Sequence, residues 1–285
     1  MMLTTLVDRE AVEAHLGDAG WRLFDCRFNL MDVDEGRRAW EQGHLPGALY
    51  AHLDKDLAGP ITATTGRHPL PDWQAFAERL RSWGLRESDQ VVVYDDGPGA
   101  VAARLWWMLR HIGHRGVAVM DGGFKRWQEE HRPLNGEAPR FSRSTYNIRQ
   151  VGDVGLVASG DVLGSLGTDK MQILDARSAA RYRGEAEPLD AVAGHIPGAW
   201  NRPFTENLNA QGNFLPAEML KARFQDLLGA KLASEVVHSC GSGVTACHNL
   251  LAMEHAGLNG SQLYAGSWSE WITDPLRPVS VGEED

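Results

Sequence analysis

The sequence predicts an α/β fold made of two copies of one domain, each a mainly parallel sheet flanked by helices. Two observations carry this prediction: a long internal repeat, and a regular alternation of apolar runs with segments of helical period. The chain has 285 residues, which is enough for two domains of ordinary size.

Four segments of the first half recur in the same order in the second half. The pairs are Leu23–Arg27 with Ile173–Arg177, Gly43–Ala48 with Gly194–Ala199, Val92–Gly97 with Val236–Gly241, and Asp121–Trp127 with Ala265–Trp271. Their nearly constant offset indicates a duplicated domain rather than a solenoid. A polar stretch rich in Pro and Gly, Arg132–Arg140, begins the connection between the copies. We therefore expect domains over 1–140 and 156–285, joined by a linker over 141–155.

Short apolar runs predict buried strands in both copies. These runs are Leu23–Arg27, Val91–Tyr94, Val117–Met120, Ile173–Ala176, Glu235–Ser239 and Gln262–Tyr264. Helical periodicity predicts one helix that starts at Asp72 and ends near Gly84, a buried helix over Ala100–His111, and a third over Val244–Glu254. Alternating strands and helices favour parallel sheets, whose ligands bind beyond the carboxyl ends of the strands.

Composition excludes several classes of protein. The net charge of −10, with acidic and basic residues interspersed, argues against a nucleic-acid surface. No stretch approaches the ~20 apolar residues of a membrane span, and Met1–Asp8 has no secretory pattern. The three cysteines, Cys26, Cys240 and Cys247, form neither a disulfide framework nor a metal-type spacing. We therefore expect a cytoplasmic protein without membrane or nucleic-acid partners.

The stretch Val236–Ala246 reads as a strand, a Gly-rich loop and the start of a helix, with Cys240 at the mouth of the loop. Backbone N–H groups and the positive end of a helix would face its sulfur, so we expect a stabilised thiolate there. The sequence repeat aligns Cys240 with Asp96, which makes the first copy non-catalytic. We expect Cys26 and Cys247 to be core residues.

These segments resemble the two-domain rhodanese-type sulfurtransferases over nearly the whole chain. The resemblance rests on both Asp-x-Arg strands, both His-x-Pro-Gly turns, Trp106 and Trp107, Asp121–Gly123 and the Cys240 loop. The hexapeptide Cys240–Thr245 resembles the loop of the mercaptopyruvate-using branch. Relatives that use thiosulfate typically carry basic residues where this chain has Gly241 and Ser242.

The resemblance implies that Cys240 takes a sulfur atom from 3-mercaptopyruvate as a persulfide and passes it to cyanide or to a thiol, such as thioredoxin or a small thiol. It implies no metal or organic cofactor. The loop would bind and stabilise the anion, Arg181 would hold the donor's carboxylate, and Ser242, His68 and Asp54 would relay the thiol proton. The implied loop residues are Gly241, Gly243, Val244 and Thr245.

One departure from the mercaptopyruvate pattern keeps a second donor open. That branch usually has another arginine nine residues after the first, where this chain has Asp190, as the thiosulfate branch does. The alternatives are therefore a thiosulfate:cyanide sulfurtransferase and, in another class, a non-catalytic persulfide carrier or interaction module. A cysteine phosphatase needs an arginine near Ala246 to bind phosphate, and none is present there.

Overall fold

The computed structural model describes residues 2–148 and 155–283, and these form two compact units. The first unit contains residues 2–59, 70–148 and 210–214, and the second contains 60–69, 155–209 and 215–283. Two short segments thus depart from the division expected from the repeat. Residues 60–69 pack within the second unit, and residues 210–214 pack within the first.

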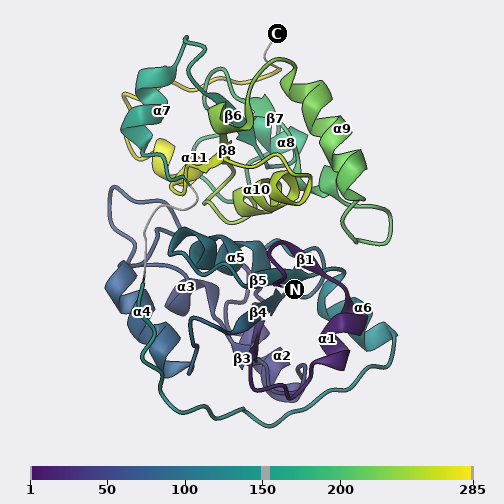
Figure 1. The fold of residues 1–285 in the computed structure, drawn as a ribbon. Helices are drawn as coiled ribbons and strands as arrows, with labels where there is room; N and C mark the ends of the chain where they lie inside the picture. Colours follow the sequence, from purple (N-terminus) through teal and green to yellow (C-terminus); the bar gives the residue numbers. More distant parts are fainter. Residues whose placement is uncertain (1, 149–154, 284–285) are drawn as a thin grey trace. The chain divides into compact units, whose positions relative to one another are not determined.

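The first unit is a five-stranded, wholly parallel sheet in the order β1-β5-β4-β2-β3, with helices around it (Figure 1). The strands are β1 Leu6–Val7, β2 Trp21–Asp25, β3 Leu49–Tyr50, β4 Gln90–Tyr94 and β5 Val117–Met120. The helices are α1 Arg9–Ala14, α2 Glu35–Gln42, α3 Leu53–Asp56, α4 Trp73–Ser82, α5 Ala102–His111 and α6 Gly123–Glu129.

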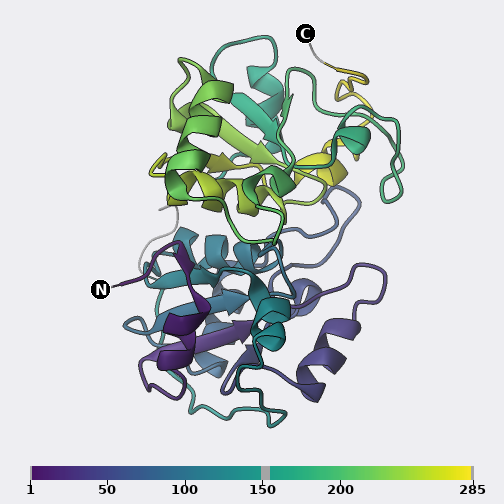
Figure 2. The ribbon, with the colours of Figure 1, turned by 90° about the vertical axis from the view of Figure 1, so that its right-hand side faces the viewer.

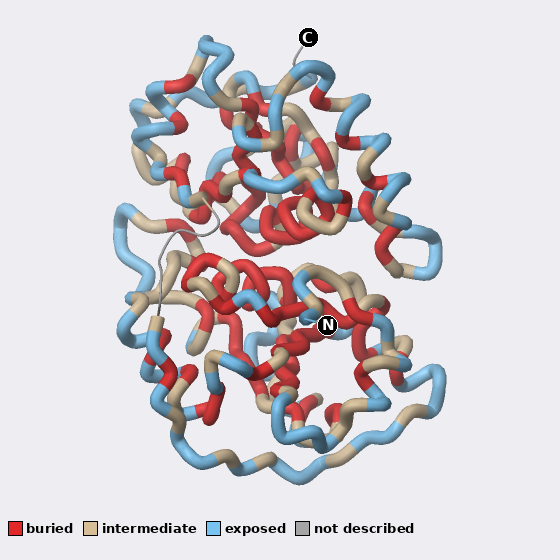
Figure 3. Tube along the Cα trace, viewed as in Figure 1, coloured by how far each residue is buried: buried red, intermediate tan, exposed pale blue. Residues whose placement is uncertain are grey.

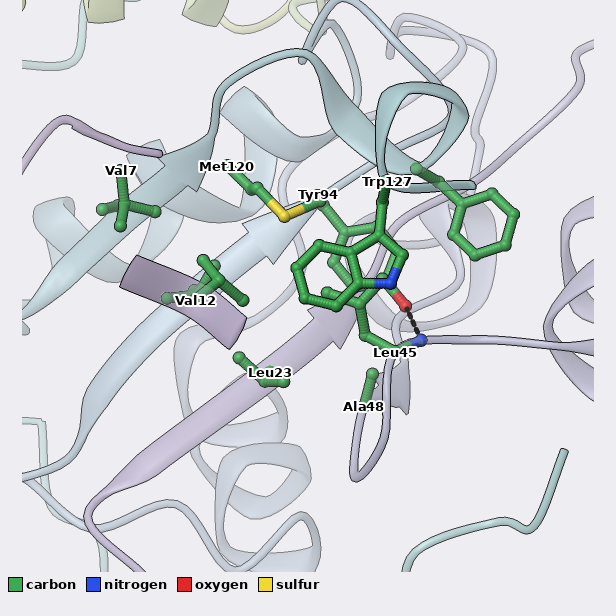
Figure 4. Packing of buried hydrophobic residues seen from close by; sticks show 11 residues of the cluster. Val7, Val12, Leu23, Leu45, Ala48, Tyr94, Met120 and Trp127 are labelled. Atoms are coloured by element: carbon green, nitrogen blue, oxygen red, sulfur yellow. Dashed lines mark hydrogen bonds between the residues drawn. The ribbon is translucent and has the colours of Figure 1, made fainter. Parts of the chain in front are cut away.

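The hydrophobic core of the first unit is formed by side chains of the apolar runs in its strands, which pack against apolar side chains of its helices. Figure 4 shows Leu23 of β2, Tyr94 of β4 and Met120 of β5 with Trp127 of α6 in this cluster. The Tyr94 hydroxyl accepts a hydrogen bond from the Leu45 N–H at 3.2 Å, which gives the buried phenol oxygen a donor. The repeated Gly-His-x-Pro-Gly turn is thereby fixed to the sheet.

The second unit is a four-stranded parallel sheet in the order β7-β6-β8-β9, again flanked by helices (Figure 2). The strands are β6 Gln172–Asp175, β7 Trp200–Asn201, β8 Val236–Ser239 and β9 Gln262–Leu263. The α-helices are α7 Ser159–Ser165, α8 Ala179–Tyr182, α9 Ala217–Leu228, α10 Ala246–His255 and α11 Ser267–Trp271, and the 3₁₀ helices are η1 Phe204–Asn207 and η2 Ala233–Glu235.

The predicted strands and helices are confirmed with shifts of one or two residues at their ends. Asp72 caps α4, because its carboxylate accepts from the N–H groups of Gln74 and Ala75. Helices α5 and α10 are buried over almost their whole length, as Figure 3 shows, in agreement with apolar residues on most of their faces. Of the helices in the described part of the chain, none has the length and apolar character to span a bilayer.

Candidate active site

Cys240 lies immediately after β8, at the carboxyl edge of the sheet, where parallel strands end together. Its N–H donates to the Ser267 hydroxyl at 3.0 Å, and its carbonyl accepts from the Trp268 N–H at 3.0 Å. Only 2% of the residue is exposed. The backbone around the sulfur is therefore fixed on both sides before any substrate binds.

The loop after Cys240 turns back toward its sulfur. The Gly243 N–H donates to Cys240 Sγ at 3.2 Å, and Gly243 has a φ of +75°. A Cβ atom at Gly243 would lie 2.1 Å from the Ala265 carbonyl oxygen, so no larger residue fits without moving the loop. Helix α10 begins at Ala246, directly after Val244 and Thr245. The predicted loop residues are thus gathered at the amino end of this helix.

The hydrogen bonds of the two sheets correct the sequence alignment of Cys240 with Asp96. Asp25 pairs with Tyr94 in the first sheet, as Asp175 pairs with Ser239 in the second. The Asp95 carbonyl accepts from the Phe124 N–H, as the Cys240 carbonyl accepts from Trp268. The residue at the position of Cys240 is therefore Asp95.

The loop of the first unit contains one residue more, which explains the misalignment. From Asp95 to the start of α5 at Ala102 the chain advances seven positions, whereas from Cys240 to the start of α10 it advances six. Gly99, with a φ of +81°, stands where Gly243 stands in the second unit. Helix and strand correspond in both copies, and the extra residue lies between Asp95 and Gly99.

Asp95 fills the concave loop of the first unit with its own carboxylate. Oδ1 accepts from the N–H groups of Gly97 at 3.0 Å and Gly99 at 2.9 Å, and Oδ2 accepts from Val101 at 2.8 Å and Ala102 at 3.2 Å. Burial raises the pKa of Asp95, while these four hydrogen bonds oppose that effect. This loop is therefore an anion cradle, and in the first unit it is already occupied.

Arg181 lies beside the Cys240 loop at the end of α8 and is held by two carboxylates. Its Nε and Nη2 donate to Glu187, with Nη2 at 2.7 Å from Oε1, and Nη2 also donates to Asp190 Oδ2 at 3.1 Å. Burial opposes the charge on Glu187, but hydrogen bonds from Arg181 and from backbone N–H groups outweigh it and lower the pKa of Glu187. Both acidic groups fix the orientation of the guanidinium.

A second arginine, Arg67, reaches the same loop from the segment 60–69. A Cβ atom built on Gly241 would lie 2.9 Å from Arg67 Nη2 and 3.4 Å from Arg181 Nη1, so both guanidinium groups converge beside the residue after the nucleophile. Arg67 also pairs with Asp190. The sequence predicts His68 as a site residue in this segment but not Arg67, because nothing in the local pattern shows that the segment packs within the second unit.

Two members of the predicted proton relay lie together in the second unit. His68 Nδ1 is 2.8 Å from the Ser242 hydroxyl, and both residues are buried. The Arg67 N–H donates to the Ser269 hydroxyl at 3.0 Å, which holds the segment that carries His68. Asp54 belongs to the first unit, where it lies on α3 and burial raises its pKa. Its link to His68 remains a prediction.

The other two cysteines lie in the interior, as expected for core residues. Cys26 and Cys247 are fully buried, and all three cysteines are free. Burial raises the pKa of the Cys26 thiol well above its usual value. The Cys247 thiol donates to the Gly243 carbonyl at 3.3 Å and supports the loop from behind.

The second unit has a cysteine at the end of a parallel strand, followed by an anion-binding loop, and its α/β fold is duplicated in the first unit. Comparison of the sequence with models of protein families points to the same class of protein. Residues 8–130 and 160–274 each match the Rhodanese-like domain, and the chain belongs to this family.

Three relatives show which members the chain is similar to. It is 47% identical to a probable 3-mercaptopyruvate sulfurtransferase of Pseudomonas aeruginosa, over 99% of this chain and 100% of that protein. It is 38% identical to a putative thiosulfate sulfurtransferase of Mycobacterium tuberculosis, over 91% and 90% of the two chains. The solved structure of 3-mercaptopyruvate sulfurtransferase from Leishmania major matches with a TM-score of 0.84 at 32% identity, covering 96% of this chain and 75% of that one.

Proposed function

We propose that this protein is a 3-mercaptopyruvate sulfurtransferase that carries sulfur as a persulfide on Cys240 and delivers it to a thiol or to cyanide. The single observation that carries the proposal is the loop after Cys240, whose Gly243 N–H donates to Cys240 Sγ and whose counterpart in the first unit binds the Asp95 carboxylate. The 47% identity to a probable 3-mercaptopyruvate sulfurtransferase over the whole chain supports the choice of reaction.

The side chain of Asp95 has the same connectivity as a cysteine persulfide. Cβ–Cγ–Oδ in the first corresponds to Cβ–Sγ–Sδ in the second, and both carry negative charge on the outer atom. Asp95 Oδ2 accepts from Val101 and Ala102, whose counterparts are Thr245 and Ala246. The outer sulfur of a Cys240 persulfide would therefore be stabilised by these two N–H groups and by the amino end of α10.

The reaction balances with a thiolate nucleophile and one mobile proton. Cys240 S⁻ attacks the thiol sulfur of 3-mercaptopyruvate, the sulfur–carbon bond breaks, and the enolate of pyruvate leaves. The proton of the donor's thiol ends on the methyl carbon of pyruvate. A thiol acceptor then takes the outer sulfur to become a persulfide, or cyanide takes it to become thiocyanate, and Cys240 returns to the thiolate.

Ser242 and His68 suit the transfer of that proton. With its hydroxyl hydrogen donated to His68 Nδ1 at 2.8 Å, Ser242 Oγ is free to accept the proton of the donor's thiol. Loss of this pair would slow persulfide formation from a thiol donor but not from a donor that carries no thiol proton.

The charges around the loop favour a monoanionic donor. Arg67, Arg181 and Arg177 are matched by Asp190, Glu187 and Asp175 within ion-pair distance. The net charge of these six groups is zero, so the site offers directed N–H donors without a large positive field. A carboxylate of a 2-oxo acid matches such a site better than the dianion thiosulfate does.

A thiosulfate:cyanide sulfurtransferase remains the second candidate because of one residue. Asp190 is acidic at a position where the mercaptopyruvate branch that this chain resembles usually carries arginine. In addition, the M. tuberculosis relative is named a putative thiosulfate sulfurtransferase. For either donor we propose a cytoplasmic enzyme with thioredoxin or a small thiol as acceptor. The free state of all three cysteines agrees with a reducing location.

Steady-state turnover with each donor tests the assignment. We expect kcat/KM for 3-mercaptopyruvate to exceed kcat/KM for thiosulfate by at least about tenfold. We also expect the Cys240→Ser variant to have neither activity. A preference for thiosulfate by orders of magnitude would reverse the choice of donor. Uptake of sulfur on Cys240 without turnover to any acceptor would instead favour a persulfide carrier.

A further inference from the structure

We propose that Arg67 determines donor specificity by binding the donor's carboxylate together with Arg181, and so supplies the second guanidinium that Asp190 cannot. This inference rests on the proposed function, because the carboxylate belongs to 3-mercaptopyruvate. It adds a residue from the segment 60–69, which the chain brings to the second unit from the first half of the sequence.

Two donor groups of the arginines point to one place. Arg67 Nη2 and Arg181 Nη1 lie 2.9 Å and 3.4 Å from the position of a Cβ atom on Gly241, which follows the nucleophile. Within residues 2–148 and 155–283, neither of these two nitrogens has a hydrogen-bond partner. Two unused N–H₂ groups on one small space match the two oxygens of a carboxylate.

The acidic partners hold the arginines by their other nitrogens. Asp190 accepts from Arg67 Nη1 through Oδ1 and from Arg181 Nη2 through Oδ2, and its side chain is 4% exposed against 24% for Arg67 and 18% for Arg181. The buried carboxylate thus bridges two more exposed guanidinium groups. Both arginines are held with low freedom to reorient, which reduces the entropy lost on binding.

Gly241 has a defined part in this arrangement. Its φ lies outside the left-handed region, so backbone conformation does not require glycine there. A side chain at this position would occupy the space beside Arg67 Nη2 instead. The absence of a side chain at residue 241 therefore lets Arg67 approach the loop, and a basic residue there would exclude it.

The test compares two donors that differ only at the carboxylate: 3-mercaptopyruvate and mercaptoacetone, in which a methyl group replaces it. Arg67→Met is expected to lower kcat/KM for 3-mercaptopyruvate about 10- to 100-fold, mainly through KM, since one charge-assisted hydrogen-bonding group is lost. The same variant is expected to leave kcat/KM for mercaptoacetone within about twofold of wild type. Arg38→Met, at an exposed arginine paired with Asp32, is the matched control and should change neither.

An equal loss with both donors would overturn the inference, because a structural role would affect them alike. Unchanged kcat/KM with both donors would also overturn it. These outcomes differ from a failure of the proposed function, in which the wild type itself would not turn over 3-mercaptopyruvate and both proposals would fall.

A charge exchange keeps the test decisive if Arg67→Met is poorly folded. The double variant Arg67→Asp with Asp190→Arg retains an ion pair between the two positions and moves the guanidinium to the other side of it. It is expected to recover at least about tenfold of the discrimination between the two donors that Arg67→Asp alone loses. No recovery in a folded double variant would contradict a carboxylate site built from this pair.

Discussion

Replacing Gly243 by alanine is the sharpest perturbation of the anion cradle. The residue has a φ of +75°, where an L-residue is roughly 1–2 kcal/mol less stable than in the right-handed region. The added Cβ would also lie 2.1 Å from the Ala265 carbonyl oxygen, and ordinary contact begins at 3.4 Å. The difference, 3.4 − 2.1 = 1.3 Å, is the shift that the loop or its neighbour must make.

A shift of that size removes the hydrogen bond from Gly243 N–H to Cys240 Sγ, which is 3.2 Å long in the native loop. Loss of one such preorganised donor lowers kcat by about 10²- to 10³-fold in enzymes that stabilise an anion. We expect a decrease of that order in kcat with 3-mercaptopyruvate, and a shorter lifetime of the Cys240 persulfide. Cyanolysis of the isolated persulfide at timed intervals measures the second quantity.

Gly257→Ala separates the effect of backbone strain from the effect on the cradle. Gly257 follows α10 with a φ of +76°, and among the described residues no atom beyond its chain neighbours lies within 4 Å of a Cβ built there. This variant should have a free energy of unfolding about 1–2 kcal/mol lower than wild type and an unchanged kcat. If Gly243→Ala kept kcat within a factor of three of wild type while folded, the cradle could not be what stabilises the persulfide.

Three further predictions concern proton transfer, pH and the first unit. Ser242→Ala and His68→Gln should each lower turnover of 3-mercaptopyruvate about 10- to 10³-fold, and the double variant should lose little more, since the two groups act as one relay; additive losses would contradict this. Burial lowers the pKa of His238 from 6.5 to about 3. Below pH 6.5 the unfolded chain therefore binds a proton at His238 that the folded chain does not bind, and the free energy of unfolding falls as the pH drops. In urea unfolding, wild type should lose about 1.4 kcal/mol more than His238→Leu between pH 7.5 and 5.5, and equal losses would refute this. Asp95→Asn should lower the free energy of unfolding by about 1–3 kcal/mol without changing kcat, because the amide keeps one acceptor oxygen and its NH₂ group cannot accept from the other two backbone N–H groups; an unchanged urea midpoint would count against the filled cradle.

The sheets were predictable from the sequence because their strands are short apolar runs that local periodicity identifies. β5 coincides with the predicted run Val117–Met120, and Asp72 caps α4 as its residue type suggests. The match of Cys240 to Asp96 was wrong by one residue. Sequence alignment of two glycine-rich loops cannot decide where an extra residue lies, whereas the sheet hydrogen bonds assign Asp95 directly.

Residues of the candidate site differ in how far the sequence reveals them. Cys240 and its loop are contiguous, so the strand–loop–helix pattern identifies them. Arg67 is 174 positions from Gly241, and its proximity depends on a tertiary contact that also includes Ser269. No periodicity or local motif reports such a contact. From the sequence alone, Asp190 indicates only that an arginine typical of the mercaptopyruvate branch is absent. In the structure its carboxylate forms ion pairs with both Arg67 and Arg181.

Mass spectrometry of the intact protein and of its proteolytic peptides, after brief exposure to 3-mercaptopyruvate, tests the central claim most directly. A gain of about 32 Da, one sulfur atom, is expected on the peptide that contains Cys240, as is its loss on addition of cyanide. Cys240→Ser should show no gain, although Cys26 and Cys247 remain free thiols. A wild-type protein that turns over the donor without ever carrying this adduct, or one that carries it on Cys26 or Cys247, would contradict a persulfide on Cys240.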